Sequence, residues 1–210
     1  MSRRVVPGAF VGRLAIAAAA LALMVVRAPE LSSAQLRPAE PDPGDLLIAT
    51  RELDDPNFAE TVVLLLHTGP DGAGGVVLNR PTPVRVATVM PQIEALSGRS
   101  DTLRWGGPVE PEAALLLVRL EEPPPEGEHV VDDVYVVRTR AGIEELLRRG
   151  LPETSLRVFA GYAGWTTGQL EWELERGSWH LRRGDAAKIF DDDVAGLWER
   201  LVKIARSPTA

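Results

Sequence analysis

The sequence predicts an α/β (α+β) fold with one domain over residues 44–205, built on a mixed β-sheet. Short apolar segments rich in β-branched residues are typical of buried strands, and they occur at 46–50, 61–67, 76–78, 113–120 and 156–160. Amphipathic patterns predict helices at 139–149 and 194–205, the latter burying Leu197, Trp198, Leu201 and Ile204. The strands at 61–67 and 76–78 are close enough to pair as a hairpin, so antiparallel pairing is expected.

Shorter elements are expected between these segments. A turn lies at 54–57, with Phe58 holding it to the core, and the glycine-rich stretch 69–75 is read as a flexible or tight connection. Residues 86–96 predict a helix that Pro91 kinks or begins. Further strands are expected at 103–105, 130–131, 134–138 and 178–181, a solvated acidic loop at 121–128, and a helical turn at 185–190 capped by Asp185.

The stretch 158–179 joins a buried strand to a short acidic helix through glycines. Gly161, Gly164 and Gly168 interrupt the apolar run, and glycine suits positive φ angles or close contact between backbones. We expect the strand to end in a tight glycine turn and the helix to start near Thr166 or Thr167, either of which can cap it. The free N–H groups at such a junction can bind a ligand, although many α/β proteins use the same turn only to change direction.

Residues 1–34 have the pattern of a secretory signal peptide. Basic residues precede an apolar run of 13 residues at 14–26, and small residues lead up to a cleavage point after Ala34. That run is shorter than the roughly 20 residues of a membrane span, but a retained N-terminal anchor is an alternative. A true start at Met24 is another, which would make the protein cytoplasmic rather than exported to the periplasm. Residues 35–43 are a proline-rich linker, and 206–210 a frayed tail.

Composition excludes several classes of function. The chain has no cysteine, which excludes disulfides and thiol chemistry. Residues 1–34 hold four arginines and one glutamate, so the remainder keeps 19 of the 23 basic and 29 of the 30 acidic residues, a net charge of −10. Such a negative chain repels phosphate backbones, so we do not expect nucleic acid as a partner. Membrane contact is expected only through an uncleaved leader.

Motifs for common chemistry are missing from the sequence. The three histidines lack metal-ligand spacing, no serine lies in a nucleophile elbow, and no glycine-rich loop has a phosphate-binding pattern. The acidic clusters at 54–55, 132–133 and 191–193 are explained by turns and caps. We therefore predict no catalytic residue, no cofactor and no metal.

The motifs of the chain, taken together and in order, resemble those of the AlgH/YqgE family. The matching residues are Gly44-x-Leu-Leu-Ile-Ala, Asp55-Pro56-x-Phe58, Gly72-Ala73-x-Gly75-Val-Val-Leu-Asn79-Arg80-Pro81, Gly106-Gly107-Pro108-Val109 and Gly161-Tyr-Ala-Gly-Trp-x-x-Gly168-Gln169-Leu170-Glu171-x-Glu173, with Trp179 after them. The resemblance implies a single domain with a mixed, bent sheet that approaches a pseudo-barrel and is flanked by helices. It implies little about activity, since the family is largely uncharacterised and some members are labelled transcriptional regulators, linked to alginate synthesis, without a DNA-binding motif. A leader and a strongly acidic chain both depart from the family's usual pattern, and argue against that label here.

Three hypotheses about function follow. The leading one is a non-enzymatic binding or regulatory domain that recognises an unidentified small molecule or protein. Its surface would combine aromatic and glycine-rich loops at strand ends: Asn79, Arg80, Pro81, Trp105, Gly106, Gly107, Pro108, Gly161, Tyr162, Gly164, Trp165, Gly168, Gln169 and Glu171. The second is a hydrolase-like enzyme that uses Glu171 or Glu173 with His67, which requires these groups to lie within hydrogen-bonding reach. The third is the transcriptional regulator.

Overall fold

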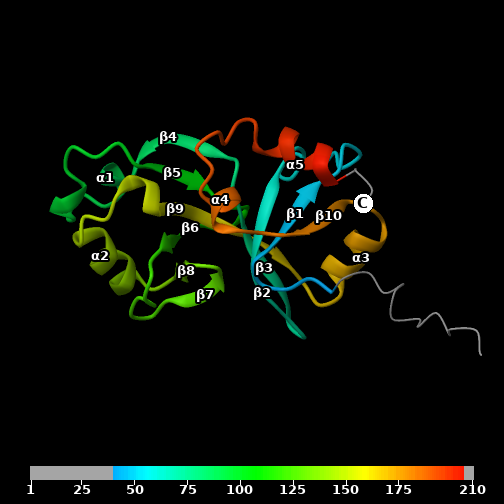
Figure 1. The fold of residues 1–210 in the computed structure, drawn as a ribbon, viewed down its shortest axis with the longest axis horizontal. Helices are drawn as coiled ribbons and strands as arrows, with labels where there is room; N and C mark the ends of the chain where they lie inside the picture. The colour runs from blue at the N-terminus through cyan, green and yellow to red at the C-terminus, as the bar shows by residue number, and fades with distance from the viewer. Residues whose placement is uncertain (1–39, 206–210) are drawn as a thin grey trace, which may run out of the picture. The chain divides into compact units, whose positions relative to one another are not determined.

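Residues 40–205 are described by a computed structural model, in which ten strands join into one sheet (Figure 1). Neighbouring strands follow the order β10-β1-β2-β3-β9-β6-β8-β7, and β5 pairs with both β9 and β4. The β5–β9 pair is parallel and the other pairs are antiparallel, which confirms the predicted mixed sheet. The strands are β1 (Asp45–Ala49), β2 (Val62–Gly69), β3 (Gly72–Val77), β4 (Pro81–Arg85), β5 (Thr102–Trp105), β6 (Val109–Arg119), β7 (Glu128–Val131), β8 (Val134–Val137), β9 (Leu156–Trp165) and β10 (Trp179–Arg183).

The sheet curls into a half-barrel, so that strands far apart in its order come into contact. Gly44, just before β1, packs so closely on β7 that a Cβ atom there would lie 2.8 Å from the carbonyl oxygen of Val130. On the same side, the Ala186 N–H donates to Oδ2 of Asp132 in the β7–β8 turn. The bent sheet within a single α/β domain is therefore confirmed.

Two apolar cores lie on the two faces of the sheet. One fills the curl and includes Phe159, Leu117 and Trp198, whose Nε1–H donates to the Ala49 carbonyl at 2.8 Å. The other lies on the opposite face of β6, β8 and β9, where Ile143 and Leu146 of α2 cover it. Figure 1 shows α1 and α2 at the end of the sheet formed by β6–β8, and α3 and α5 at the end formed by β1 and β10. The helices are α1 (Val86–Val89), α2 (Arg140–Arg148), α3 (Gln169–Glu175), α4 (Ala186–Ile189) and α5 (Leu197–Ala205), with 3-10 turns η2 (Glu94–Leu96) and η3 (Glu153–Ser155).

The helix predicted over 86–96 is wrong. Helix α1 stops after four residues, Pro91 follows in an irregular segment, and η2 adds only one further turn. Two valines and a threonine in α1 are weak helix formers, and proline has no N–H to continue the ladder. The segment bends, and buries Val86, Ile93 and Leu96 in the second core.

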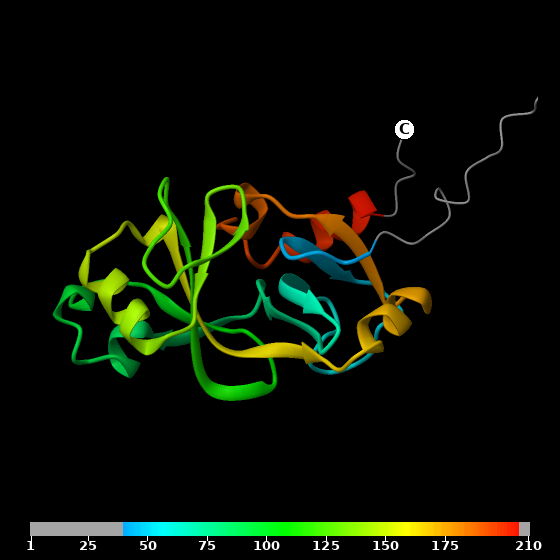
Figure 2. The same ribbon diagram turned by 90° about the horizontal axis from the view of Figure 1, so that it is seen from below.

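Two glycine-rich segments that were predicted as turns are strands. Strand β3 begins at Gly72, so residues 72–75 pair with β2 and the hairpin turn is confined to 70–71. Strand β9 does not end at Ala160 but continues through Gly161 and Gly164 to Trp165. Figure 2 shows β9 (yellow) crossing from the half that contains α2 into the half that contains α3. Glycine is needed in both strands because a Cβ atom at Gly72, Gly74, Gly75 or Gly161 would clash with a neighbouring backbone or side chain.

The ends of two helices also differ from prediction. Gly168, with φ +74°, is the N-cap of α3, so neither Thr166 nor Thr167 caps it. In α5 the side chain of Ile204 is exposed, and Val202 is buried in its place. The predicted cap of α4 is confirmed, since Asp185 Oδ1 accepts the Lys188 N–H at 2.8 Å.

The predicted signal peptide or anchor (1–34), residues 35–39 of the linker and the tail 206–210 lie outside the described residues. At the described end of the linker, Arg183 donates a hydrogen bond to the Pro43 carbonyl. None of the helices between residues 40 and 205 is long and apolar enough to cross a membrane.

Candidate functional site

Three glycines lie where β9 passes from one half of the sheet to the other. The first half of β9 pairs with β5 and β6, and residues 163–165 pair with β3. A Cβ atom on Gly106 would lie 2.2 Å from the Gly161 carbonyl oxygen, and one on Gly107 would lie 2.1 Å from the Tyr162 carbonyl carbon. Gly161 has φ +70° and would place a Cβ 2.5 Å from the Gly107 oxygen. These glycines therefore permit the backbone of residues 106–107 to cross that of β9 in direct contact. This point, formed by Gly106, Gly107 and Gly161, is here called the glycine crossing.

Strand β6 bulges away from β9 opposite this crossing. Val109 pairs with Tyr162 and Ala114 pairs with Ala160, so residues 110–113 face Gly161 alone. Glu110, at the start of the bulge, has φ +46°, a left-handed conformation that costs a non-glycine residue about 1–3 kcal/mol. Pro111 follows it and, because proline has no N–H to pair, it belongs in a bulge rather than in a regular ladder.

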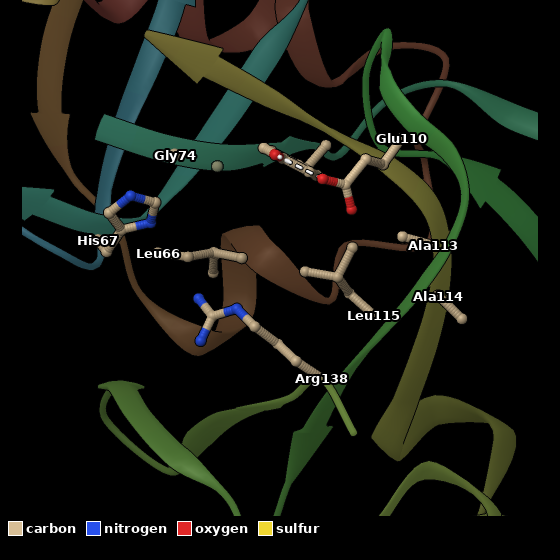
Figure 3. A pocket seen from close by; sticks show the side chains of 10 residues that line it. Leu66, His67, Gly74, Glu110, Ala113, Ala114, Leu115 and Arg138 are labelled. Carbon is tan, nitrogen blue, oxygen red and sulfur yellow. Dashed lines mark hydrogen bonds between the residues drawn. The ribbon is translucent and has the colours of Figure 1, made fainter. Parts of the chain in front are cut away.

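A cavity of about 340 Å³, here called the bulge cavity, lies beside the bulge (Figure 3). Its apolar surface comes from Leu66, Leu115, Ala113 and the backbones of β3. Four polar side chains reach it from four strands or their ends. The full lining is Leu66, His67, Gly74, Gly75, Glu110, Ala113, Ala114, Leu115, Arg138 and Tyr162.

Glu110 is the least constrained charge in the bulge cavity. Its carboxylate Oε1 accepts one long hydrogen bond, from the Tyr162 hydroxyl at 3.4 Å, and it forms no ion pair with any side chain of the described region. Desolvation, together with the charge of Glu110, raises the pKa of the Tyr162 hydroxyl above its ordinary value of 10.0. The phenol therefore stays protonated at neutral pH and donates to the carboxylate.

Arg138 and His67 supply the opposite side of the bulge cavity. Figure 3 shows the guanidinium of Arg138 pointing toward Leu66 and His67. Arg138 Nη1 donates to Glu128, which leaves its other N–H groups without a protein acceptor in residues 40–205. The ring of His67 covers Gly74, where a Cβ would lie 2.3 Å from the histidine Cε1. The absence of a side chain at Gly74 therefore leaves the space that the imidazole occupies.

A second cavity of about 380 Å³ adjoins the bulge cavity on the side of α2. The two share Ala113, Ala114 and Arg138, and the second is also lined by Glu112, which follows Pro111 in the bulge. Its floor contains Leu103, Ile143 and Phe159. The bulge thus carries one glutamate toward each cavity.

Of the predicted surface, only Tyr162 lines the bulge cavity. Asn79 is buried and links two backbones: its Oδ1 accepts the Val62 N–H and its amide donates to the Glu60 carbonyl, both at 2.9 Å. Arg80 donates to the Ala59 carbonyl. Pro81 begins β4, Trp105 is half-buried in β5, and Pro108 is exposed beyond the glycine crossing.

Among the remaining predicted residues, Trp165 and Gln169 bind Glu173 of α3, and together with Trp179 they form a group here called the Glu173 cluster. Glu173 Oε2 accepts the indole N–H groups of Trp165 at 2.9 Å and Trp179 at 2.8 Å, and Oε1 accepts the Gln169 amide at 3.0 Å. Trp165 also packs on Trp179 and Phe58. Gly164, Gly168, Gln169 and Glu171 are exposed. The structure thus divides the predicted surface among Asn79, the glycine crossing and the Glu173 cluster.

The hydrolase hypothesis gains no support from this arrangement. Both carboxylate oxygens of Glu173 accept hydrogen bonds from residues that hold the fold, and none of these donors is His67. His67 of β2 pairs with Gly74 of β3, and Trp165 of β9 pairs with Ala73 of β3. Because Ala73 and Gly74 are consecutive, the side chains of His67 and Trp165 lie on opposite faces of the sheet. Residues 40–205 contain no cluster of histidine and acidic side chains that could hold a metal ion.

Glu110 and Arg138 are the site residues that sequence reasoning missed. One signal was available: Glu110-Pro111 comes just before the strand predicted at 113–120, and proline beside a strand is confined to its edge, its first residue or a bulge. For Arg138, which follows β8, no comparable local signal exists.

Comparison with known proteins identifies the family. The AlgH-like family profile matches residues 46–209. This chain belongs to the AlgH-like family. A UPF0301 protein of Streptomyces avermitilis is 37% identical to it over 172 residues, which cover 80% of this AlgH-like chain and 88% of the relative. A UPF0301 protein of Chlorobaculum tepidum is 33% identical over 165 residues, covering 77% and 85%.

Two solved structures share the AlgH-like fold. The solution structure of the AlgH protein from Pseudomonas aeruginosa matches with a TM-score of 0.62 and 25% identity, over 83% of this chain and all of that one (100%). The crystal structure of a protein from Corynebacterium diphtheriae matches with a TM-score of 0.69 and 24% identity, over 84% and 92%. The names of these relatives state no activity.

Proposed function

We propose that this AlgH-like chain is a non-enzymatic binding domain whose small-molecule ligand enters the bulge cavity. The observation that carries the proposal is Glu110, a non-glycine residue held at φ +46° with its carboxylate beside the cavity and no cation from residues 40–205 paired to it. Strained backbone conformations of this kind concentrate at functional sites, where the surrounding structure compensates their cost. A volume of about 340 Å³ is within the range of small-molecule sites.

The lining of the bulge cavity indicates the chemistry of the ligand. The carboxylate of Glu110, which has no ion-pair partner in the described region, favours an amine or another hydrogen-bond donor, because charge-assisted hydrogen bonds are the stronger ones. The N–H groups of Arg138 that have no acceptor among residues 40–205 favour an acidic group. Leu66, Leu115 and the alanines of the bulge favour a ligand with an apolar chain that packs against these four side chains. A small amino acid-like molecule with an apolar chain of about four to eight carbons matches all three.

The experiment is a ¹H–¹⁵N NMR titration with three matched probes: L-norleucine, hexanoate and hexylamine. We expect norleucine to shift the amides of Gly74, Gly75 and Ala113 saturably, and more strongly than either probe with a single charged group. Glu110→Gln should weaken norleucine binding about tenfold, because an ionic hydrogen bond of about 1.4 kcal/mol is lost.

Glu112→Gln is the control, because Glu112 lies on the same bulge but lines the neighbouring cavity. It should leave norleucine binding unchanged, and the probe should be recovered chemically intact. Equal weakening by the two variants, or an absence of saturable shifts at these amides with all three probes, would refute the proposed site.

A further inference from the structure

Two arginines lie on one face of the sheet, away from the bulge cavity. In the parallel β5–β9 pair, Arg104 is opposite Phe159, and Arg157 lies two residues before Phe159 on the same strand. Side chains two apart share a face, so both arginines extend from the face that carries Phe159. The Arg157 side chain is only 9% exposed, and Arg104 is half-buried.

Within residues 40–205, Asp192 carries the one carboxylate that accepts a hydrogen bond from either arginine, and the charge of Asp101 also acts on Arg157. Arg157 Nη2 donates to Oδ1 of Asp192 at 3.0 Å, and its other hydrogen bonds go to backbone carbonyls. The guanidinium also lies over the Phe190 ring, 5.3 Å from its centroid, and the buried Nε has no hydrogen-bond partner among the described residues. Arg104 donates to the Leu78 carbonyl at 3.2 Å, and no carboxylate within the described residues accepts from it. Burial, followed by repulsion from Arg157, lowers the pKa of Arg104 to about 10.

Asp192 is a weak counter-ion for this pair. Its side chain is 83% exposed, and ion pairs that face water contribute only about 0–1 kcal/mol. Because this exposed carboxylate contacts Arg157 Nη2 at 3.0 Å, an anion from solvent that replaced it would meet the guanidinium at the same point. An anion with more oxygens could contact both arginines and exclude Asp192.

We propose that Arg104 and Arg157 form a binding site for a small oxyanion, which displaces the carboxylate of Asp192. Guanidinium groups present planar pairs of N–H donors that match phosphate and carboxylate oxygens. Apart from the Nη1 group that donates to Leu78, Arg104 brings N–H groups with no acceptor among residues 40–205, and Arg157 is held in place by the carbonyls of Glu153, Leu156 and Phe190. The site is independent of the bulge cavity, so either can fail without the other.

The test replaces Asp192 and supplies the anion from solution. Asp192→Ala should lower the melting temperature in chloride buffer, and about 10 mM phosphate at matched ionic strength should raise it again by about 3–5 °C. Wild-type protein should respond less, because Asp192 competes for Arg157. Acetate is a second arm: a response equal to that of phosphate assigns the site to carboxylate-bearing ligands, and a weaker one assigns it to phosphate.

Two further variants decide the outcome. Asp191→Ala is the matched control, because Asp191 pairs with Arg200 rather than with Arg157; it should not be rescued by either anion. Adding Arg104→Gln to Asp192→Ala should abolish the rescue, and Arg104→Lys, which keeps the charge but not the fork of donors, should reduce it. Equal anion responses in the Asp191 and Asp192 variants, or a response that survives Arg104→Gln, would overturn the proposal.

Discussion

The hydroxyl of Tyr162 on β9 lies 3.4 Å from Oε1 of Glu110 on β6, at the point where β6 begins to bulge away from β9. This pair connects the glycine crossing with the bulge cavity. Tyr162 follows Gly161 directly, and Glu110 follows Val109, the last residue of β6 paired before the bulge. The position of the carboxylate therefore depends on the crossing of the two backbones.

Gly161→Ala is expected to destabilise the fold by at least about 2 kcal/mol, because it adds the cost of φ +70° to a clash with the Gly107 carbonyl oxygen. Urea unfolding measures this effect. Gly177→Ala is the control, since Gly177 has φ +76° but nothing within 4 Å of a Cβ. It should cost only about 1–2 kcal/mol. If both variants lose the same stability, contact between the backbones does not explain Gly161.

Asn79→Ala is expected to cost about 2–3 kcal/mol, because it leaves the buried Val62 N–H and the Glu60 carbonyl without their side-chain partner. Asn79→Asp keeps an acceptor for Val62 but presents no amide donor to Glu60, so it should also destabilise. Urea unfolding at neutral pH measures both. A folded Asn79→Ala protein with unchanged stability would restore Asn79 as a candidate for ligand contact.

Glu173→Ala is expected to lower stability by about 2–4 kcal/mol and to change the fluorescence of Trp165 and Trp179, which both donate to this carboxylate. Glu175→Ala removes an exposed glutamate of the same helix and should leave stability and emission unchanged. Thermal unfolding followed by tryptophan emission compares the two. Equal behaviour would show that Glu173 does not hold the two indoles together.

The pH dependence of stability should include a contribution from Glu153. Its carboxylate accepts the Ser100 hydroxyl at 2.6 Å and the Ser100 N–H at 2.9 Å, and these hydrogen bonds lower its pKa below the ordinary 4.5. A lowered native pKa gives stability that is present above 4.5 and is lost as the pH falls through the native value. Ser100→Ala should raise the pKa of Glu153 toward 4.5 in a carboxyl NMR titration, whereas Ser97→Ala should not. An unchanged titration in Ser100→Ala would contradict the assignment.

The sequence predicted most strands, the α4 cap and the mixed sheet, because short apolar segments and Asp185 act locally. It failed where the conformation depends on a distant partner. In the sequence, Gly161 indicates the end of a strand. In the structure, its backbone packs against that of Gly107, and β9 continues through it to Trp165. The irregular segment after Val89 could not be predicted either, because its apolar residues are equally compatible with a helix and with a bend that buries Ile93 and Leu96.

The candidate site was less predictable than the fold. The glycine and aromatic motifs led to the crossing and to the Glu173 cluster, which are explained by packing and hydrogen bonds. The polar side chains of the bulge cavity come from β2, the bulge, the end of β8 and β9, and only the curl of the sheet brings them together. Their separation in sequence concealed the site, although Pro111 marked the bulge.

The most direct measurement of the central claim, that the ligand enters beside the bulge, is a set of intermolecular NOEs between ¹³C-labelled protein and unlabelled L-norleucine. We predict NOEs from the norleucine side chain to the methyl groups of Leu66 and Leu115, the two leucines that line the bulge cavity. NOEs to Val89 or Met90 of the neighbouring cavity instead, or to neither set, would contradict it.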